Sequence, residues 1–186
     1  KNPHFIDQSR AIVFASNREG DSLKTESKKL ILPTGGYDIF YYNYSGKSSG
    51  LRRITNTADF NETQPMQYDS ANITYLSDEN GIINRYIAHL YSALSFVDTV
   101  EHYRMIVDNY VLTDYPRNIL SQDINITHNR VSEIIFYNGK YRLFVNRITD
   151  GKVLSQSTLP KTLFRNEQLH KVESKIESPP VIEKIS

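Results

Sequence analysis

Apolar and polar residues alternate in short runs along most of this chain. The run AIVFAS at residues 11–16 is followed by the turn-like NREG, and the run NITYLS at residues 72–77 is followed by DENG. Alternation over four to eight residues predicts a strand that turns one face towards a core. Asn, Asp and Gly are favoured in tight turns. We therefore expect both runs to be β-strands that end in turns.

These two runs belong to a longer repeat. Ile12, Ile73 and Ile134 lie 61 residues apart, and an aromatic residue stands two positions after each of them. Recurrence at a fixed period indicates a protein built from similar structural units. We expect three units over residues 1–159, with limits at about 2–62, 63–122 and 123–159.

Each unit contains further alternating runs, one before the central run and two after it. The expected flanking strands are at residues 2–7, 37–43 and 51–56 in the first unit, 63–69, 84–90 and 116–120 in the second, and 123–129, 141–147 and 152–158 in the third. Strands joined by short turns pair antiparallel. Each unit therefore predicts a four-stranded antiparallel sheet.

Sheets of four strands repeated along a chain predict an all-β fold made of β-propeller blades, because radial stacking protects most sheet edges. A blade usually takes about 40–45 residues, so the longer period requires insertions. We place them at residues 17–36 and 91–115; the second is apolar enough for an added strand pair or an extended outer strand. Closed propellers have at least about four blades, so we expect these three to be part of a larger propeller.

The repeat pattern ends at Pro160. The last segment, residues 160–186, is charged and has Leu169, Val172 and Ile176 at helical spacing before a pair of prolines. Proline ends a helix that precedes it. We expect a C-terminal linker or short helix.

Composition narrows the class of protein. The chain has 13 Tyr and 8 Phe, no Cys, and 22 basic against 21 acidic residues. Aromatic richness favours strands, the charge balance argues against nucleic-acid binding, and the absence of Cys excludes disulfides and thiolate sites. No apolar run approaches the roughly 18 residues of a membrane helix, so we expect no direct membrane insertion.

Candidate chemical motifs are few. Residues 46–50 spell G-x-S-x-G, the pattern of a nucleophile elbow, but that motif requires a strand leading into a helix. Here it stands between two expected strands, where Gly and Ser are ordinary turn residues. The acidic turns at 17–20 and 78–81 could offer oxygen ligands to Ca²⁺, yet they lack the spacing of a complete site. We expect no catalytic residue, no metal and no cofactor.

The repeated phrases resemble a known family. Pro3 and Pro65 each stand four residues before an Asp, the strands at 11–16 and 72–77 end in Ser-Asn-Arg and Ser-Asp-Glu-Asn-Gly, and DIFYYN and LRRITN follow in the first unit. This order is similar to the TolB-like propeller repeat, which is related to the propeller domains of tricorn-type and prolyl-oligopeptidase-type peptidases. The resemblance covers the first two units best. It implies a segment of a large periplasmic protein of Gram-negative bacteria.

From this resemblance we expect a non-catalytic module for protein interaction or scaffolding in the periplasm or cell envelope, with an envelope protein as partner. An alternative is the gating propeller of a serine peptidase whose catalytic domain lies outside this chain, and a weaker one is a carbohydrate-binding propeller. Because loops on rigid scaffolds commonly bind partners, we take the contact residues from the two insertions. They are Asp21, Lys24, Lys28, Phe96, Tyr103 and Tyr110.

Overall fold

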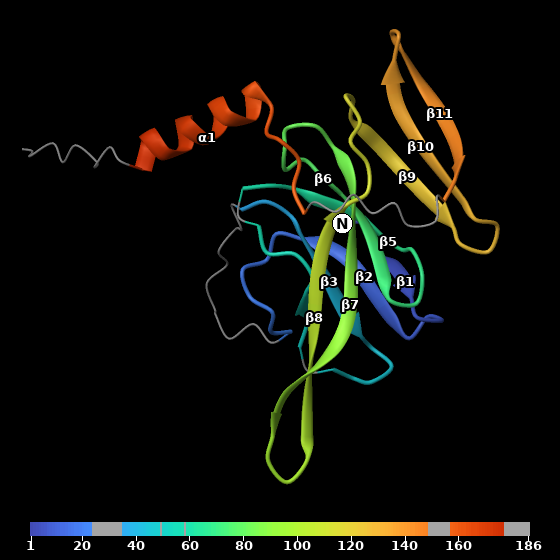
Figure 1. Ribbon diagram of the computed structural model, residues 1–186, viewed down its shortest axis with the longest axis vertical. Coiled ribbons are helices and arrows are strands. Elements are labelled where there is room, and N and C mark those ends of the chain that lie inside the picture. Colours follow the sequence, from blue (N-terminus) through green and yellow to red (C-terminus); the bar gives the residue numbers. More distant parts are fainter. Residues whose placement is uncertain (24–34, 49, 58, 149–156, 177–186) are drawn as a thin grey trace, which may run out of the picture.

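The structure is a computed structural model that describes residues 1–23, 35–48, 50–57, 59–148 and 157–176. These residues form three antiparallel sheets in chain order, so the predicted all-β class is confirmed (Figure 1). The first sheet contains β1 (His4–Ile6), β2 (Ala11–Ser16), β3 (Asp38–Asn43) and β4 (Arg52–Arg53). The second contains β5 (Glu62–Gln67), β6 (Asn72–Ser77), β7 (Asn84–Val97) and β8 (Glu101–Val111). The third contains β9 (Ile119–Asn125), β10 (Arg130–Tyr137) and β11 (Lys140–Arg147).

The predicted fourth strands need correction. In the second sheet the fourth strand is β8, which lies in the long insertion, and not residues 116–120. The end of that segment instead begins β9, the first strand of the third sheet, which therefore starts before residue 123. The insertion pairs more favourably because β7 and β8 share a hairpin, whereas Pro116 cannot donate to a strand ladder. The fourth strand expected at 152–158 lies almost entirely outside the described residues.

The repeat corresponds to one position in each sheet. Ile12, Ile73 and Ile134 lie in β2, β6 and β10, which are the second strands of their sheets. The aromatic residue two positions later is in each case directly opposite an aromatic residue of the third strand. These cross-strand pairs are Phe14 with Phe40, Tyr75 with Tyr86, and Phe136 with Tyr141, with ring centroids 5.9, 5.8 and 5.2 Å apart. Such pairs stabilise a sheet.

The first and second sheets pack face to face around the main core. Ala11, Val13 and Ala15 of β2 are fully buried, and they belong to the same clusters as Ile73 and Tyr75 of β6. Small side chains on β2 leave room for the larger ones of the neighbouring sheet, which is how close packing is reached. The strand alternation predicted from the sequence thus produces this seam.

The third sheet packs against the second sheet through the strand face opposite to the one that the repeat leads us to expect. Val131, Glu133 and Ile135 of β10 are buried against the second sheet, whereas Ile134 is exposed. Ile73 at the corresponding place of the repeat is buried against the first sheet. Because side chains alternate with period two, a slip of one residue exchanges the two faces of a strand. The 61-residue spacing therefore identifies equivalent strands but not equivalent faces in the third unit.

The first strands of the three sheets lie next to one another. The Asp7 backbone N–H, just after β1, donates to Gln67 Oε1 of β5 at 3.2 Å. Gln122 of β9 donates twice to Gln64 of β5: its backbone N–H donates to Gln64 Oε1 at 3.0 Å, and its Nε2 donates to the Gln64 carbonyl at 2.9 Å. Direct bonds between these strands hold the three sheets in a common stack.

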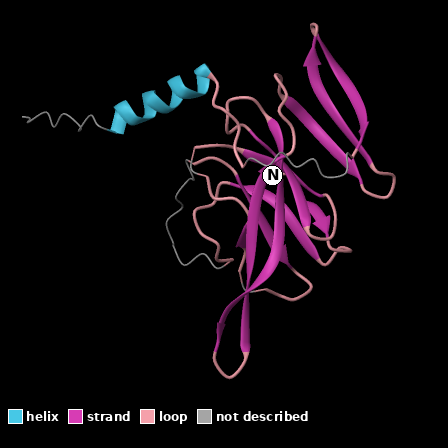
Figure 2. Cartoon of the chain, in the orientation of Figure 1, coloured by secondary structure: helices cyan, strands magenta, loops and turns pink. Residues whose placement is uncertain are grey.

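A helix, α1 (Leu163–Ile176), leaves the sheets near the turn after β6 (Figure 2). Its first turn is held by Arg165, whose guanidinium donates to the carbonyls of Asp59 and Glu79 at 2.7 and 3.2 Å and lies over the Phe60 ring. Leu163 and Phe164 are exposed at its start. Among the described residues, no helix is both long and apolar enough to cross a membrane.

Candidate functional site

The most prominent surface feature is a two-stranded arm formed by the distal halves of β7 and β8. The strand β6 pairs with β7 only as far as His89, and beyond that point β7 pairs with β8 alone. This ribbon extends away from the sheets (Figure 1). Near its tip Leu94, Phe96, Val97, Val100 and Tyr103 are between 52% and 62% exposed. Large apolar side chains are thus displayed on a narrow projection.

Of the three contact residues predicted in the second insertion, Phe96 and Tyr103 lie at this tip and Tyr110 does not. Phe96 stacks on the ring of His102 at 4.2 Å, and the Tyr103 hydroxyl donates to Glu101 at 2.6 Å. His102 also bonds to Asp98, 3.1 Å away. Tyr110 lies near the end of β8 that joins the body, where it is opposite Ile87 and half-buried. The tip therefore combines aromatic rings with two carboxylates.

The first insertion contributes less to the described structure. Asp21 is exposed and accepts a hydrogen bond from Arg53 Nε at 3.2 Å, which ties it to β4. Lys24 and Lys28 lie outside the described residues. The structure therefore separates Asp21 from Phe96 and Tyr103, which lie on a different sheet.

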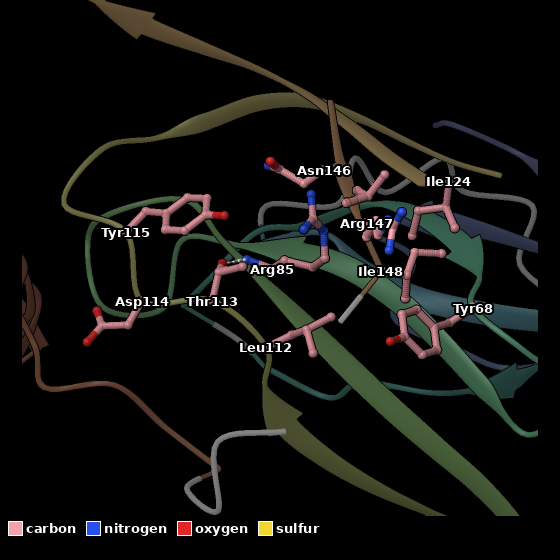
Figure 3. A pocket seen from close by; sticks show the side chains of 11 residues that line it. Tyr68, Arg85, Leu112, Thr113, Asp114, Tyr115, Ile124, Asn146, Arg147 and Ile148 are labelled. Carbon is pink, nitrogen blue, oxygen red and sulfur yellow. Dashed lines mark hydrogen bonds between the residues drawn. The ribbon is translucent and has the colours of Figure 1, made fainter. Parts of the chain in front are cut away.

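A pocket of about 580 Å³ lies between the second and third sheets (Figure 3). Its apolar lining comes from Leu112, Ile124, Val131 and Ile148. Its polar lining comes from Tyr68, Arg85, Thr113, Asp114, Tyr115, Asn146 and Arg147. Its hydroxyl groups belong to Tyr68, Thr113 and Tyr115, and Thr113 Oγ donates to the amide oxygen of Asn84 at 3.0 Å, not to a carboxylate.

Arg85 is the central charge of this seam, and it extends towards Asn146 in Figure 3. Its Nε donates to Gln122 at 2.6 Å and its terminal nitrogen to Glu133 at 2.8 Å. Both charged side chains are at most 5% exposed. Burial, followed by the charge of Glu133, raises the pKa of the nearby Tyr115. The pair cross-links two sheets, and single residues in separate strands give no sequence signal for such a contact.

A second buried polar cluster lies at the seam between the first and second sheets. Thr57 Oγ donates to Glu62 at 2.8 Å, its backbone N–H donates to Asp38 at 2.8 Å, and Arg53 forms an ion pair with Asp38. Thr55 Oγ donates to Glu62 at 2.9 Å. Burial, opposed by these threonine bonds and assisted by the charge of Asp38, raises the pKa of Glu62 to about 8.

The sequence motifs with catalytic or metal potential occupy turns. Ser48 of G-x-S-x-G lies between β3 and β4, and its hydroxyl donates to the Gly50 carbonyl at 2.9 Å. In the acidic turn after β6, Asp78 accepts bonds from the backbone and side chain of Asn61 at 2.8 and 3.0 Å. Throughout the part of the chain that the structure describes, no three His, Asp or Glu residues are grouped to hold a metal ion.

Comparison with protein-family models and with curated proteins finds no match for this chain.

Proposed function

We propose that this chain is a non-catalytic module of β-propeller blades that binds a partner protein through the arm of β7 and β8. The observation that carries the proposal is the projecting tip, where five large apolar side chains are more than half exposed. Exposed apolar surface of this kind marks interaction sites. The partner we propose is a protein, because the tip presents a ribbon and no enclosed cavity for a small ligand.

A partner would stabilise the arm. A two-stranded hairpin without a covering layer is marginally stable in water. The first sheet covers β7 and β8 only in the halves nearest the body. There Leu90, Met105 and Val107 pack against the cores. A protein that covered the tip would bury Leu94 and Tyr103, which are directly opposite each other.

The arrangement of the sheets supports the blade proposal. Their first strands are bonded in sequence, and each sheet packs a face on the next. The outer face of the third sheet is apolar and has no covering sheet among the described residues. It carries Ile134, Phe136, Tyr141, Leu143 and Val145, which are between 36% and 73% exposed. We propose that a further blade covers this face.

The proposed location is the periplasm or cell envelope, and it rests on the resemblance to the TolB-like repeat alone. The proposed binding is tested with a photo-crosslinking amino acid placed at Tyr103 in the native cells. The matched control is the same residue at Tyr44, an exposed tyrosine after β3. We expect a discrete protein adduct from Tyr103 and none from Tyr44.

Serine at Leu94 and Val97 should reduce the Tyr103 adduct by roughly tenfold, because the lost apolar contact is worth about 1.4 kcal/mol or more. Equal adducts from Tyr103 and Tyr44, or an adduct that is insensitive to Leu94 and Val97, would contradict arm-mediated binding.

A further inference from the structure

The outermost strand of the second sheet has an open edge. β8 is 11 residues long, and no strand among the described residues pairs with the side that faces away from β7. It contains no proline, and the irregularity of the hairpin lies on β7 between Leu94 and Phe96. Natural edge strands are normally shortened, bulged or broken by proline to prevent pairing with other chains. β8 has no proline and no bulge of its own, and its charged residues, Glu101, Arg104 and Asp108, are of both signs.

The hydrogen-bonding direction of β8 shows which of its residues face outward. The Leu112 N–H, one residue beyond the strand, donates to the Arg85 carbonyl of β7 at 2.9 Å. Backbone groups alternate direction along a strand. The even-numbered residues of β8 therefore bond to β7, and Tyr103, Met105, Val107 and Asn109 present their N–H and C=O groups to the open edge.

The side chains along this edge are complementary to a reversed copy of themselves. If two β8 strands pair antiparallel with Ile106 opposite Ile106, Arg104 of each strand stands opposite Asp108 of the other. Met105 then stands opposite Val107, and Arg104, Ile106 and Asp108 share one face. Opposite charges and apolar side chains in direct cross-strand contact are the favourable pairings in a sheet.

We propose that the partner of the arm is a second copy of this chain, joined by antiparallel pairing of β8 with β8 about Ile106. This inference rests on the proposed function, since it names the partner of the same arm. The result is a continuous eight-stranded sheet with a two-fold axis at Ile106, which is the common isologous form of homodimer. Each arm tip lies beside the body end of the other β8, because Glu101 stands opposite Val111.

The axis makes a specific cross-link possible. The residues bonded through the open edge are odd-numbered, so Ile106 faces its copy as a non-hydrogen-bonded pair, in which Cα atoms are about 4.5 Å apart. That separation is within the range of a disulfide. The chain has no cysteine of its own. Ile106→Cys should therefore form a disulfide-linked dimer on mild oxidation, whereas the exposed control Tyr103→Cys, which would stand opposite Asn109, should remain largely unlinked.

Charge reversal tests the register in the purified chain by sedimentation. We expect a dimer of the 21.5 kDa chain. Arg104→Asp and Asp108→Arg should each weaken dimerisation by about tenfold or more, because each places two like-charged pairs across the axis. The double variant should restore it. The control Arg52→Asp, which reverses an exposed arginine on the edge strand of the first sheet, should leave dimerisation unchanged.

A monomer at all concentrations, or a dimer that the double variant does not restore, would overturn the β8 register. If the purified chain is monomeric while Tyr103 cross-links to a different protein, the dimer is wrong and the proposed function stands. If Tyr103 gives no adduct in cells to this chain or any other, the proposed function fails as well.

Discussion

At the scale of single residues, ionisable groups lie buried at the two seams between sheets. Asp38 and Glu62 lie between the first and second sheets, and Arg85 and Glu133 lie between the second and third. A buried ion loses its hydration, so it is tolerated only where hydrogen bonds or an opposite charge compensate. At the first seam threonine hydroxyls bond to Glu62, and at the second seam Arg85 pairs with Glu133. Each seam therefore gives its own prediction.

Glu62 should make stability depend on pH. Because burial raises its pKa from 4.5 to about 8, the folded chain binds a proton that the unfolded chain has released between these values. The free energy of unfolding should therefore fall as pH rises from about 4.5 to 8, by up to about 5 kcal/mol. Glu62→Gln keeps the threonine bonds and should remove this slope in urea unfolding at pH 5 to 9. The exposed control Glu19→Gln should retain it, and parallel profiles for wild type and Glu62→Gln would refute the assignment.

Arg85 should be essential to the second seam. Arg85→Ala leaves the Glu133 carboxylate buried without its partner, and we expect a loss of about 3–5 kcal/mol in the free energy of unfolding. Arg10→Ala is the matched control, because Arg10 pairs with Asp7 at the surface, where the side chains are 59% and 48% exposed. Exposed pairs contribute about 0–1 kcal/mol. Similar losses for the two variants in urea unfolding would show that the Arg85 pair is not buried.

At the scale of elements, alternation predicted where most strands lie but not which face of each strand is buried. The runs at 11–16 and 72–77 became β2 and β6 with unchanged limits. Alternation also gives two faces to every strand, and Val131, Glu133 and Ile135 alternate as well as Ser132, Ile134 and Phe136 do. Only packing against the second sheet, where Arg85 donates to Gln122 and Glu133 of the third sheet, selects the first set.

The sequence also did not predict which sheet edge β8 joins. Residues 91–115 indicated an added or extended strand, but turn length and apolar content do not specify which edge a strand will join. Phe96 and Tyr103 are predicted as contact residues because they lie in the second insertion, whereas Leu94 and Val97 look like interior strand residues until the arm is seen to leave the body.

The tip of the arm should contribute little to the stability of the body. Replacing residues 94–103 by Asn-Gly joins Ala93 to Arg104, which are directly opposite each other, through a favoured two-residue hairpin turn. The removed apolar side chains are more than half exposed, so the free energy of unfolding of dilute protein should change by less than about 0.5 kcal/mol. A loss comparable to that of Arg85→Ala in the same urea unfolding would mean that the tip packs on the body.

At the scale of the whole molecule, the chain is an open stack of three antiparallel sheets with an arm on the second. The three-unit organisation followed from the 61-residue repeat, because equal spacing reflects equal strand positions in the three sheets. The repeat did not predict which strand faces are buried, because a slip of one residue in the third unit exchanges the buried and the exposed face. That slip leaves Ile134, Leu143 and Val145 on the open side of the stack.

The accessibility of isoleucine, leucine and valine methyl groups to a soluble paramagnetic agent tests this stack most directly, by NMR on the isolated chain in dilute solution. We expect strong broadening at Ile134, Leu143 and Val145, which are 36%, 66% and 57% exposed, and protection at Val131 and Ile135, which are 7% and 9% exposed. Protection of Ile134 with broadening of Ile135 would mean that the third sheet packs on the second through its other face, and would refute the stack described above.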